Sequence, residues 1–155
     1  MLLMVRGVMK TRGFTLIELL IVVAIIGLLA AAAVVAVTSA AQRSRQSRTM
    51  GDMRTVALAL QSYGVDMAYY PHAADAELRT MKQLLAPTYI RVLPVNDGWS
   101  RPLRYASDGV VYTLVSYGGD GLPSPPYTGG RTHGFADDIV LVGGRFFQWP
   151  EGVQE

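Results

Sequence analysis

Residues 13–37 read GFTLIELLIVVAIIGLLAAAAVVAV and contain one charged side chain, Glu18, close to their start. The run from Phe14 to Val37 has 24 residues. A helix rises about 1.5 Å per residue, so a run of this length covers the ~30 Å hydrocarbon core of a bilayer. The stretch is therefore long enough to be a membrane-spanning helix, and it separates a short leader from a longer, mixed remainder.

The charge of the chain is unevenly distributed. The 155 residues carry a formal net charge of +2, and the leader 1–13 holds Arg6, Lys10 and Arg12 without an acid. The other residues contain 11 basic and 12 acidic side chains. We therefore expect no nucleic acid partner. The chain has no cysteine, which excludes disulfides, thiolate metal sites and cysteine nucleophiles.

Two ordinary interpretations of the apolar run meet an obstacle. A secretory signal peptide has an apolar region of roughly 7–15 residues before its cleavage site. If the cleavage site lay near Ala41, the apolar region before it would have 24 residues, which is too long for a signal peptide. A plain membrane anchor fits the length, but a carboxylate in the apolar zone costs about 2.5–3.5 kcal/mol, and a simple anchor has no use for Glu18.

The segment from Gly13 to Glu18, with its basic leader and long apolar sequel, resembles the class III signal of type IV pilins and type II secretion pseudopilins. The resemblance implies that a membrane peptidase cuts between Gly13 and Phe14 and methylates the new amine of Phe14. It also implies a filament in which Glu18 of one subunit pairs with the Phe14 amine of its neighbour. The alternative is that Glu18 is a surface acid that reaches the lipid headgroups.

The helix is expected to continue past the apolar run to about Tyr63, because residues 38–64 contain no proline and apolar residues recur there at helical spacing. These are Met50, Met53, Val56 or Ala57, Leu60 and Tyr63. We predict a leader at 1–13, a transmembrane and filament-core helix at 14–37, an amphipathic half at 38–66 and a globular α+β domain at 67–155.

The globular part is expected to be a small antiparallel sheet packed on this helix, as in pilins. The predicted elements are a short helix over 77–86, a hairpin of 103–107 with 110–117, and a second hairpin of 139–142 with 145–149. Four aromatic residues are expected in the core: Trp99, Phe146, Phe147 and Trp149. The segment 96–105 resembles the Asp-Pro-Trp-Gly-x-Pro-Tyr-x-Tyr signature of the major pseudopilin and departs from it at Gly98, Ser100 and Leu103.

The loop 118–138 is rich in glycine and proline, and loops this long are uncommon unless functional or fixed in place. In major pseudopilins this loop binds calcium, and Ser116 to Gly121 and Asp138-Ile139 resemble its two ends. The resemblance implies Ca²⁺ held by Asp120 and Asp138, with Asp137 in reserve. The alternative is an ordinary turn and a solvated strand start. His72 and His133 have no metal-ligand spacing and are expected to be exposed.

No nucleophile elbow, Walker loop or dinucleotide fingerprint is present, and we expect no enzyme. The predicted function is a structural subunit of a pilus-like filament, foremost the pseudopilus of type II secretion. The alternatives are a type IV or competence pilin and a membrane-tethered periplasmic binding domain that does not polymerise. The expected partners are other copies, prepilin peptidase, the assembly platform and minor pseudopilins. The expected location is the bacterial inner membrane, single-pass, with the globular domain in the periplasm.

Overall fold

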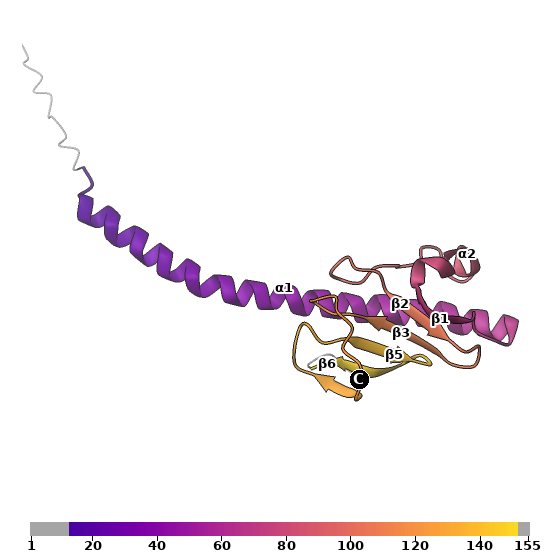
Figure 1. Ribbon diagram of the computed structural model, residues 1–155. Coiled ribbons are helices and arrows are strands. Elements are labelled where there is room, and N and C mark those ends of the chain that lie inside the picture. The colour runs from indigo at the N-terminus through magenta and orange to yellow at the C-terminus, as the bar shows by residue number, and fades with distance from the viewer. Residues whose placement is uncertain (1–12, 152–155) are drawn as a thin grey trace, which may run out of the picture. The chain divides into compact units, whose positions relative to one another are not determined.

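The computed structural model describes residues 13–151, so the basic side chains of the predicted leader lie outside the described residues. The chain divides into two compact units, Met1–Thr38 and Ser39–Glu155. The helix α1 (Leu16–Met67) belongs to both and has 52 residues (Figure 1). It ends four residues later than predicted, at Met67 instead of Tyr63.

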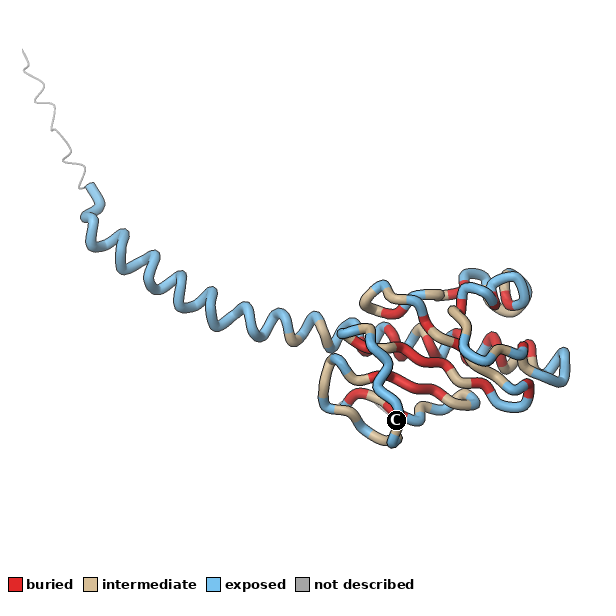
Figure 2. Tube along the Cα trace, in the orientation of Figure 1, coloured by how far each residue is buried: buried red, intermediate tan, exposed pale blue. Residues whose placement is uncertain are grey.

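The first half of α1 is apolar all round. Its most apolar window has a mean hydropathy of 3.1, and no residue of that window is buried by the rest of the described chain. Figure 2 shows this half as exposed, in contrast with the second half. A helix that is apolar on every face requires cover from lipid or from other protein chains.

The second half of α1 buries one face against the sheet. Met53, Val56 and Leu60 have no exposed surface, and the predicted set of apolar positions is confirmed. Sequence periodicity missed two buried polar side chains on the same helix, Gln46 and Thr49. The buried face is made of Gln46, Thr49, Met50, Met53, Val56, Ala57, Ala59, Leu60 and Tyr63.

The sheet has six strands in the order β1-β2-β3-β5-β6-β4, and only the β4–β6 pair is parallel. The 3-10 helix η1 (Leu78–Met81) and the short helix α2 (Lys82–Leu85) lie between β1 and β2 in the chain. The strands are β1 (Ala73–Glu77), β2 (Arg104–Ser107), β3 (Tyr112–Ser116), β4 (Gly130–Thr132), β5 (Ile139–Val142) and β6 (Arg145–Pro150).

Both predicted hairpins are confirmed. Ser107 pairs with Tyr112 across the first turn, where the Asp108 carboxylate accepts the N–H groups of Val110 and Val111 at 2.9 and 2.8 Å. In the second hairpin Gly143 and Gly144 have φ of 55° and 89°. Positive φ at both central residues is what a two-residue turn with the twist of its strands requires.

Two strands and one helix differ from the sequence prediction. The predicted helix over 77–86 is a 3-10 turn followed by one turn of α-helix, because Glu77 is already the last residue of β1. β1 and β4 were not predicted. Alanine, acidic residues and glycine are depleted in strands, so the pairing of β1 with β2 and of β4 with β6 makes these segments extended.

The aromatic prediction is partly right. Phe146 and Trp149 are half-buried and pack against the core, and the guanidinium of Arg54 lies 5.2 Å from the ring centre of Phe146. Phe147 is 44% exposed, so its placement in the core was wrong. The register of β5 and β6 shifts between Phe146 and Gln148, so Phe147 is an extra residue of a bulge, and its ring lies near Gly129.

The pseudopilin-like segment 96–102 fixes the sheet to α1. The N–H of Gly98 donates to the Thr49 hydroxyl at 2.8 Å, and the indole N–H of Trp99 donates to the Gln42 side chain at 2.7 Å. Trp99 is therefore half-buried against the helix, outside the main core. The buried Asp97 carboxylate orders the turn by accepting the N–H groups of Trp99 and Arg101 and the hydroxyl of Ser116.

Two of the three departures from the signature have local reasons, and the serine at position 100 has none that the structure shows. A Cβ on Gly98 would collide with the backbone carbonyl of Arg45, so only glycine fits at this approach. Ser100 has φ 64°, a left-handed conformation that glycine adopts without strain. Leu103 is fully buried and its side chain belongs to the core.

Two glycine-to-alanine changes test this contact. Gly98→Ala should destabilise the chain by about 1–3 kcal/mol because the new methyl group forces the segment off α1. Gly51→Ala has open space around its Cβ in an exposed part of α1 and should stabilise by about 1 kcal/mol. Denaturant unfolding of the detergent-solubilised chain, followed by tryptophan fluorescence, measures both. Equal effects of the two changes would contradict the close approach of Gly98 to Arg45.

Candidate processing, assembly and ion sites

The first turn of α1 contains a reciprocal cap between Thr15 and Glu18. The Glu18 carboxylate accepts the backbone N–H of Thr15 at 2.9 Å and its hydroxyl at 2.7 Å. The N–H of Glu18 donates in return to the Thr15 hydroxyl at 3.3 Å. This is a capping box, in which the residue before the helix and the third helical residue satisfy each other's free N–H groups.

The cap gives Glu18 a role in the single chain. Its carboxylate, placed in an apolar run, has hydrogen-bond donors before any second chain is present. The pattern Thr15-x-x-Glu18 is a sequence signature of such a box, so this function could have been predicted but was missed. Phe14 precedes the cap and is 83% exposed.

The buried carboxylate of Asp138 is the centre of the loop between β3 and β5. It accepts the N–H of Ser124 at 2.9 Å and contacts its hydroxyl at 3.4 Å, and the Tyr127 hydroxyl is a further donor. Burial is the main cause that raises the pKa of Asp138, and the charge of Asp120 raises it further. Burial and the charge of Asp138 also raise the pKa of Tyr127.

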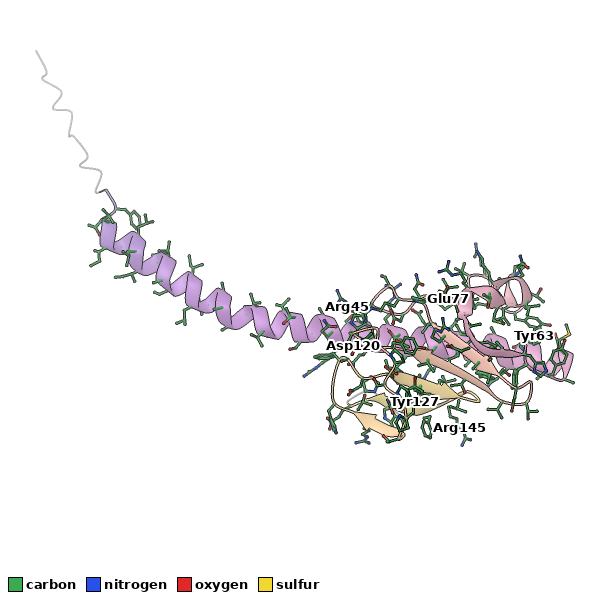
Figure 3. All side chains as sticks on the ribbon, in the orientation of Figure 1. Arg45, Tyr63, Glu77, Asp120, Tyr127 and Arg145 are labelled. Atoms are coloured by element: carbon green, nitrogen blue, oxygen red, sulfur yellow. The ribbon has the colours of Figure 1, made fainter. Side chains whose placement is uncertain are left out.

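The other two predicted ligands lie in separate local turns. Asp120 is exposed, and its carboxylate accepts the N–H of Leu122 at 3.0 Å. The Asp137 carboxylate accepts the N–H of Gly134 at 2.7 Å. Figure 3 labels Asp120 and Tyr127 on this loop. Electrostatic interaction connects Asp120 with Asp138, whereas Asp137 is engaged with Gly134.

The loop offers an incomplete set of ligands for a hard cation. Over residues 13–151 no group of three His, Cys, Asp or Glu side chains comes together. Calcium takes six to eight oxygens, which include backbone carbonyls and waters besides carboxylates. One carbonyl of this loop, that of Gly118, already accepts a hydrogen bond from the guanidinium of Arg101 at 2.6 Å. Asp120 and Asp138 therefore fit a cation only together with other carbonyls and water.

Both histidines are exposed, as predicted. His72 stacks on Tyr69 with ring centres 6.4 Å apart. The imidazole Nδ1 of His133 lies 2.7 Å from the carboxylate of Glu151. Each has a structural contact of its own.

Two protein families match this chain. Residues 8–34 match the prokaryotic N-terminal methylation motif, and residues 36–129 match type II secretion system protein G. The first match covers the segment in which Thr15 caps Glu18. The second covers most of the amphipathic half of α1, the contact segment 96–102 and the start of the long loop. No solved structure matches the chain significantly.

Curated relatives carry the same description. The type II secretion system core protein G of Pseudomonas aeruginosa is 34% identical over 70% of this chain and 84% of its own length. That of Escherichia coli is 30% identical over 75% of this chain and 87% of its own length. That of Vibrio cholerae is 29% identical over 77% of this chain and 88% of its own length. With its N-methylation motif, capped apolar helix and pilin-like sheet, the chain belongs to the protein G family of type II secretion systems, the major pseudopilins, which are structural proteins and not enzymes.

Proposed function

We propose that the chain is the subunit that polymerises through α1 into the pseudopilus of a type II secretion system, after a peptidase has cut the bond between Gly13 and Phe14. The observation that carries the proposal is an apolar half-helix that no other part of residues 13–151 covers, in a member of the protein G family. Membership in this family favours the pseudopilus over a type IV or competence pilus. In a domain that stays monomeric Glu18 would serve only the cap with Thr15, and membership in the protein G family favours assembly over that alternative.

The surroundings of the subunit follow from the same features. The apolar helix and the methylation motif fit anchoring in the inner membrane. We place the leader in the cytoplasm and the sheet in the periplasm, since prepilin peptidase acts at the membrane. The assembly platform, the minor pseudopilins and other copies of the chain are the proposed partners.

Glu18 is proposed to exchange its partners on assembly. In the single chain its carboxylate accepts the N–H and hydroxyl of Thr15. Cleavage creates a positive amine at Phe14. The cap bonds carry charge only on the carboxylate, whereas a pair with the amine joins two opposite charges, whose attraction is strong in an apolar, poorly screening surrounding. The neighbour's amine can therefore compete with the cap, and the resulting pair sets the axial register of the packed helices.

Calcium is a second proposal for the long loop. Asp138 and Asp120 are the side chains that would hold it, with backbone carbonyls, while Asp137 stays with Gly134. The ion would supply positive charge to a buried carboxylate and close a loop in a chain without disulfides. The support is the burial of Asp138, the raised pKa that this causes and the nearby charge of Asp120.

Processing predicts a specific N-terminus. Intact-mass and peptide mass spectrometry of protein extracted from the membrane should find N-methyl-Phe14 as the first residue. An intact leader, or a first residue near Ala41, would contradict processing at Gly13 and with it the filament.

Two substitutions separate the cap from the charge at the start of α1. Glu18→Gln keeps a side-chain oxygen that accepts the Thr15 N–H but removes the charge, so filaments should be lost while membrane insertion is unchanged. Thr15→Ala breaks the cap, at about 1 kcal/mol of helix stability, but keeps the carboxylate, so filaments should form. Electron microscopy and sedimentation of sheared filaments measure assembly.

The opposite pattern would reject the pairing role. If Glu18→Gln assembled normally and Thr15→Ala did not, Glu18 would act through the cap alone. Membrane fractionation of both variants controls for insertion.

Calcium removal should lower the melting temperature of the detergent-solubilised chain. A ligand at a hundred times its Kd adds about 2.7 kcal/mol, which corresponds to a shift of roughly 5–10 °C. Because burial raises the pKa of Asp138, the calcium-free chain should lose stability as pH rises through that raised value. Asp138→Asn should abolish both the chelator effect and this pH dependence, and Asp137→Asn should keep them. A melting temperature that is equal with calcium and with chelator would refute the ion site.

A further inference from the structure

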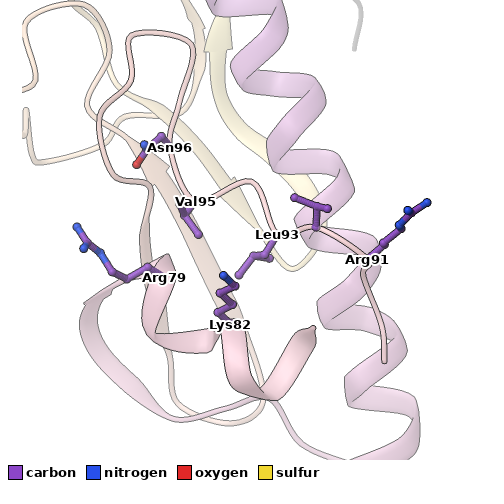
Figure 4. A pocket seen from close by; sticks show the side chains of 7 residues that line it. Arg79, Lys82, Arg91, Leu93, Val95 and Asn96 are labelled. Atoms are coloured by element: carbon purple, nitrogen blue, oxygen red, sulfur yellow. The ribbon is translucent and has the colours of Figure 1, made fainter. Parts of the chain in front are cut away.

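A hollow of about 490 Å³ lies between the segment η1–α2 and the chain that leads into β2. We call it the basic hollow; it is lined by Arg79, Lys82, Arg91 and Asn96, with Leu93 and Val95 between them (Figure 4). None of the residues that line it is acidic. Its volume is within the range of about 300–1,000 Å³ that is usual for ligand sites.

Two of the three cations of the basic hollow have no ion-pair partner among the residues that the structure describes. Arg79 is paired with Glu77, with 2.6 Å between guanidinium and carboxylate. Lys82 and Arg91 are exposed, and neither has an ion-pair partner within residues 13–151. Since the chain after residue 13 has one more acid than base, three cations around one hollow are a local concentration.

The frame of the basic hollow is fixed by the core. Leu78, Leu85 and Leu93 are buried. Leu78 directly precedes the lining residue Arg79, Leu85 is the last residue of the short helix that begins at Lys82, and Leu93 itself lines the hollow. The N–H of Leu78 donates to the Leu103 carbonyl at 2.8 Å, which ties the start of η1 to the segment before β2. The backbone that carries the three cations is therefore preorganised, which lowers the entropic cost of binding.

The chemistry of the lining selects the ligand. Two free cations favour carboxylates, and Val92, which is 76% exposed, adds apolar surface. We propose that the basic hollow binds an acidic segment of a partner protein, with two or more carboxylates and one apolar side chain.

A peptide titration tests this. Full-length, detergent-solubilised protein is mixed with a fluorescein-labelled peptide that has four acidic residues around a central leucine, and anisotropy gives the Kd. Lys82→Glu and Arg91→Glu should each weaken binding roughly fivefold or more. Arg145→Glu is the matched control: Arg145 is an exposed arginine in β6, and its change should alter the Kd less than twofold. A peptide with the acids replaced by amides should not bind.

Several results would overturn the proposal. Equal weakening by all three charge reversals would mean unspecific attraction. If Lys82→Glu or Arg91→Glu abolished binding to phosphatidylserine vesicles but left peptide binding unchanged, the basic hollow would be a lipid site. A change in self-association by Lys82→Glu or Arg91→Glu, without an effect on the peptide, would identify a contact between copies of this chain.

Discussion

Burial of apolar surface along α1 is the interaction on which the rest of the structure depends. In the second half of the helix the chain provides this cover itself, through the face that contains Met53, Val56 and Leu60. In the first half the described part of the chain provides none, because every residue of the apolar window is exposed. A fully exposed leucine or isoleucine forgoes about 1.5–3 kcal/mol of burial, so a lipid bilayer or a bundle of other copies has to supply the cover. In the proposed function the same helix serves as a membrane segment before assembly and as a filament core afterwards.

The sheet has to remain on α1 while the first half changes its surroundings. Segment 96–102 provides the attachment through two hydrogen bonds. The N–H of Gly98 donates to the Thr49 hydroxyl, and the indole N–H of Trp99 donates to the Gln42 side chain. Asp97 holds this segment in shape from inside, since its buried carboxylate accepts three hydrogen bonds. The attachment is polar and directional, which fixes the position of the sheet along the helix more narrowly than apolar packing alone.

The sequence predicted those parts in which local pattern and tertiary structure agree. The long helix, its buried face and the two hairpins are such parts, because helical periodicity and glycine turns are local signals. β1 and β4 could not be predicted, since Ala73–Glu77 and Gly130–Thr132 have residues with weak strand preference and become extended only by pairing. The processing site between Gly13 and Phe14 was predicted from residues 13–18 by resemblance and stays a prediction. The donors to Asp138 could not, because Ser124 and Tyr127 come to it through the path of the loop. The capping box, in contrast, could have been predicted from the spacing of Thr15 and Glu18, and it gives the carboxylate a local role besides the intermolecular role that we propose.

The central claim is that Glu18 leaves Thr15 for the Phe14 amine of a neighbouring subunit when the filament forms. Solid-state NMR distance measurement on mixed filaments tests it most directly. One population of subunits carries ¹⁵N in Phe14 and the other carries ¹³C in the Glu18 carboxylate, so dephasing can arise only between chains. The account predicts a nitrogen–carbon distance consistent with an ion pair whose N···O separation is about 4 Å or less. Filaments without intermolecular dephasing, with the Glu18 carboxylate still at the Thr15 N–H, would contradict it.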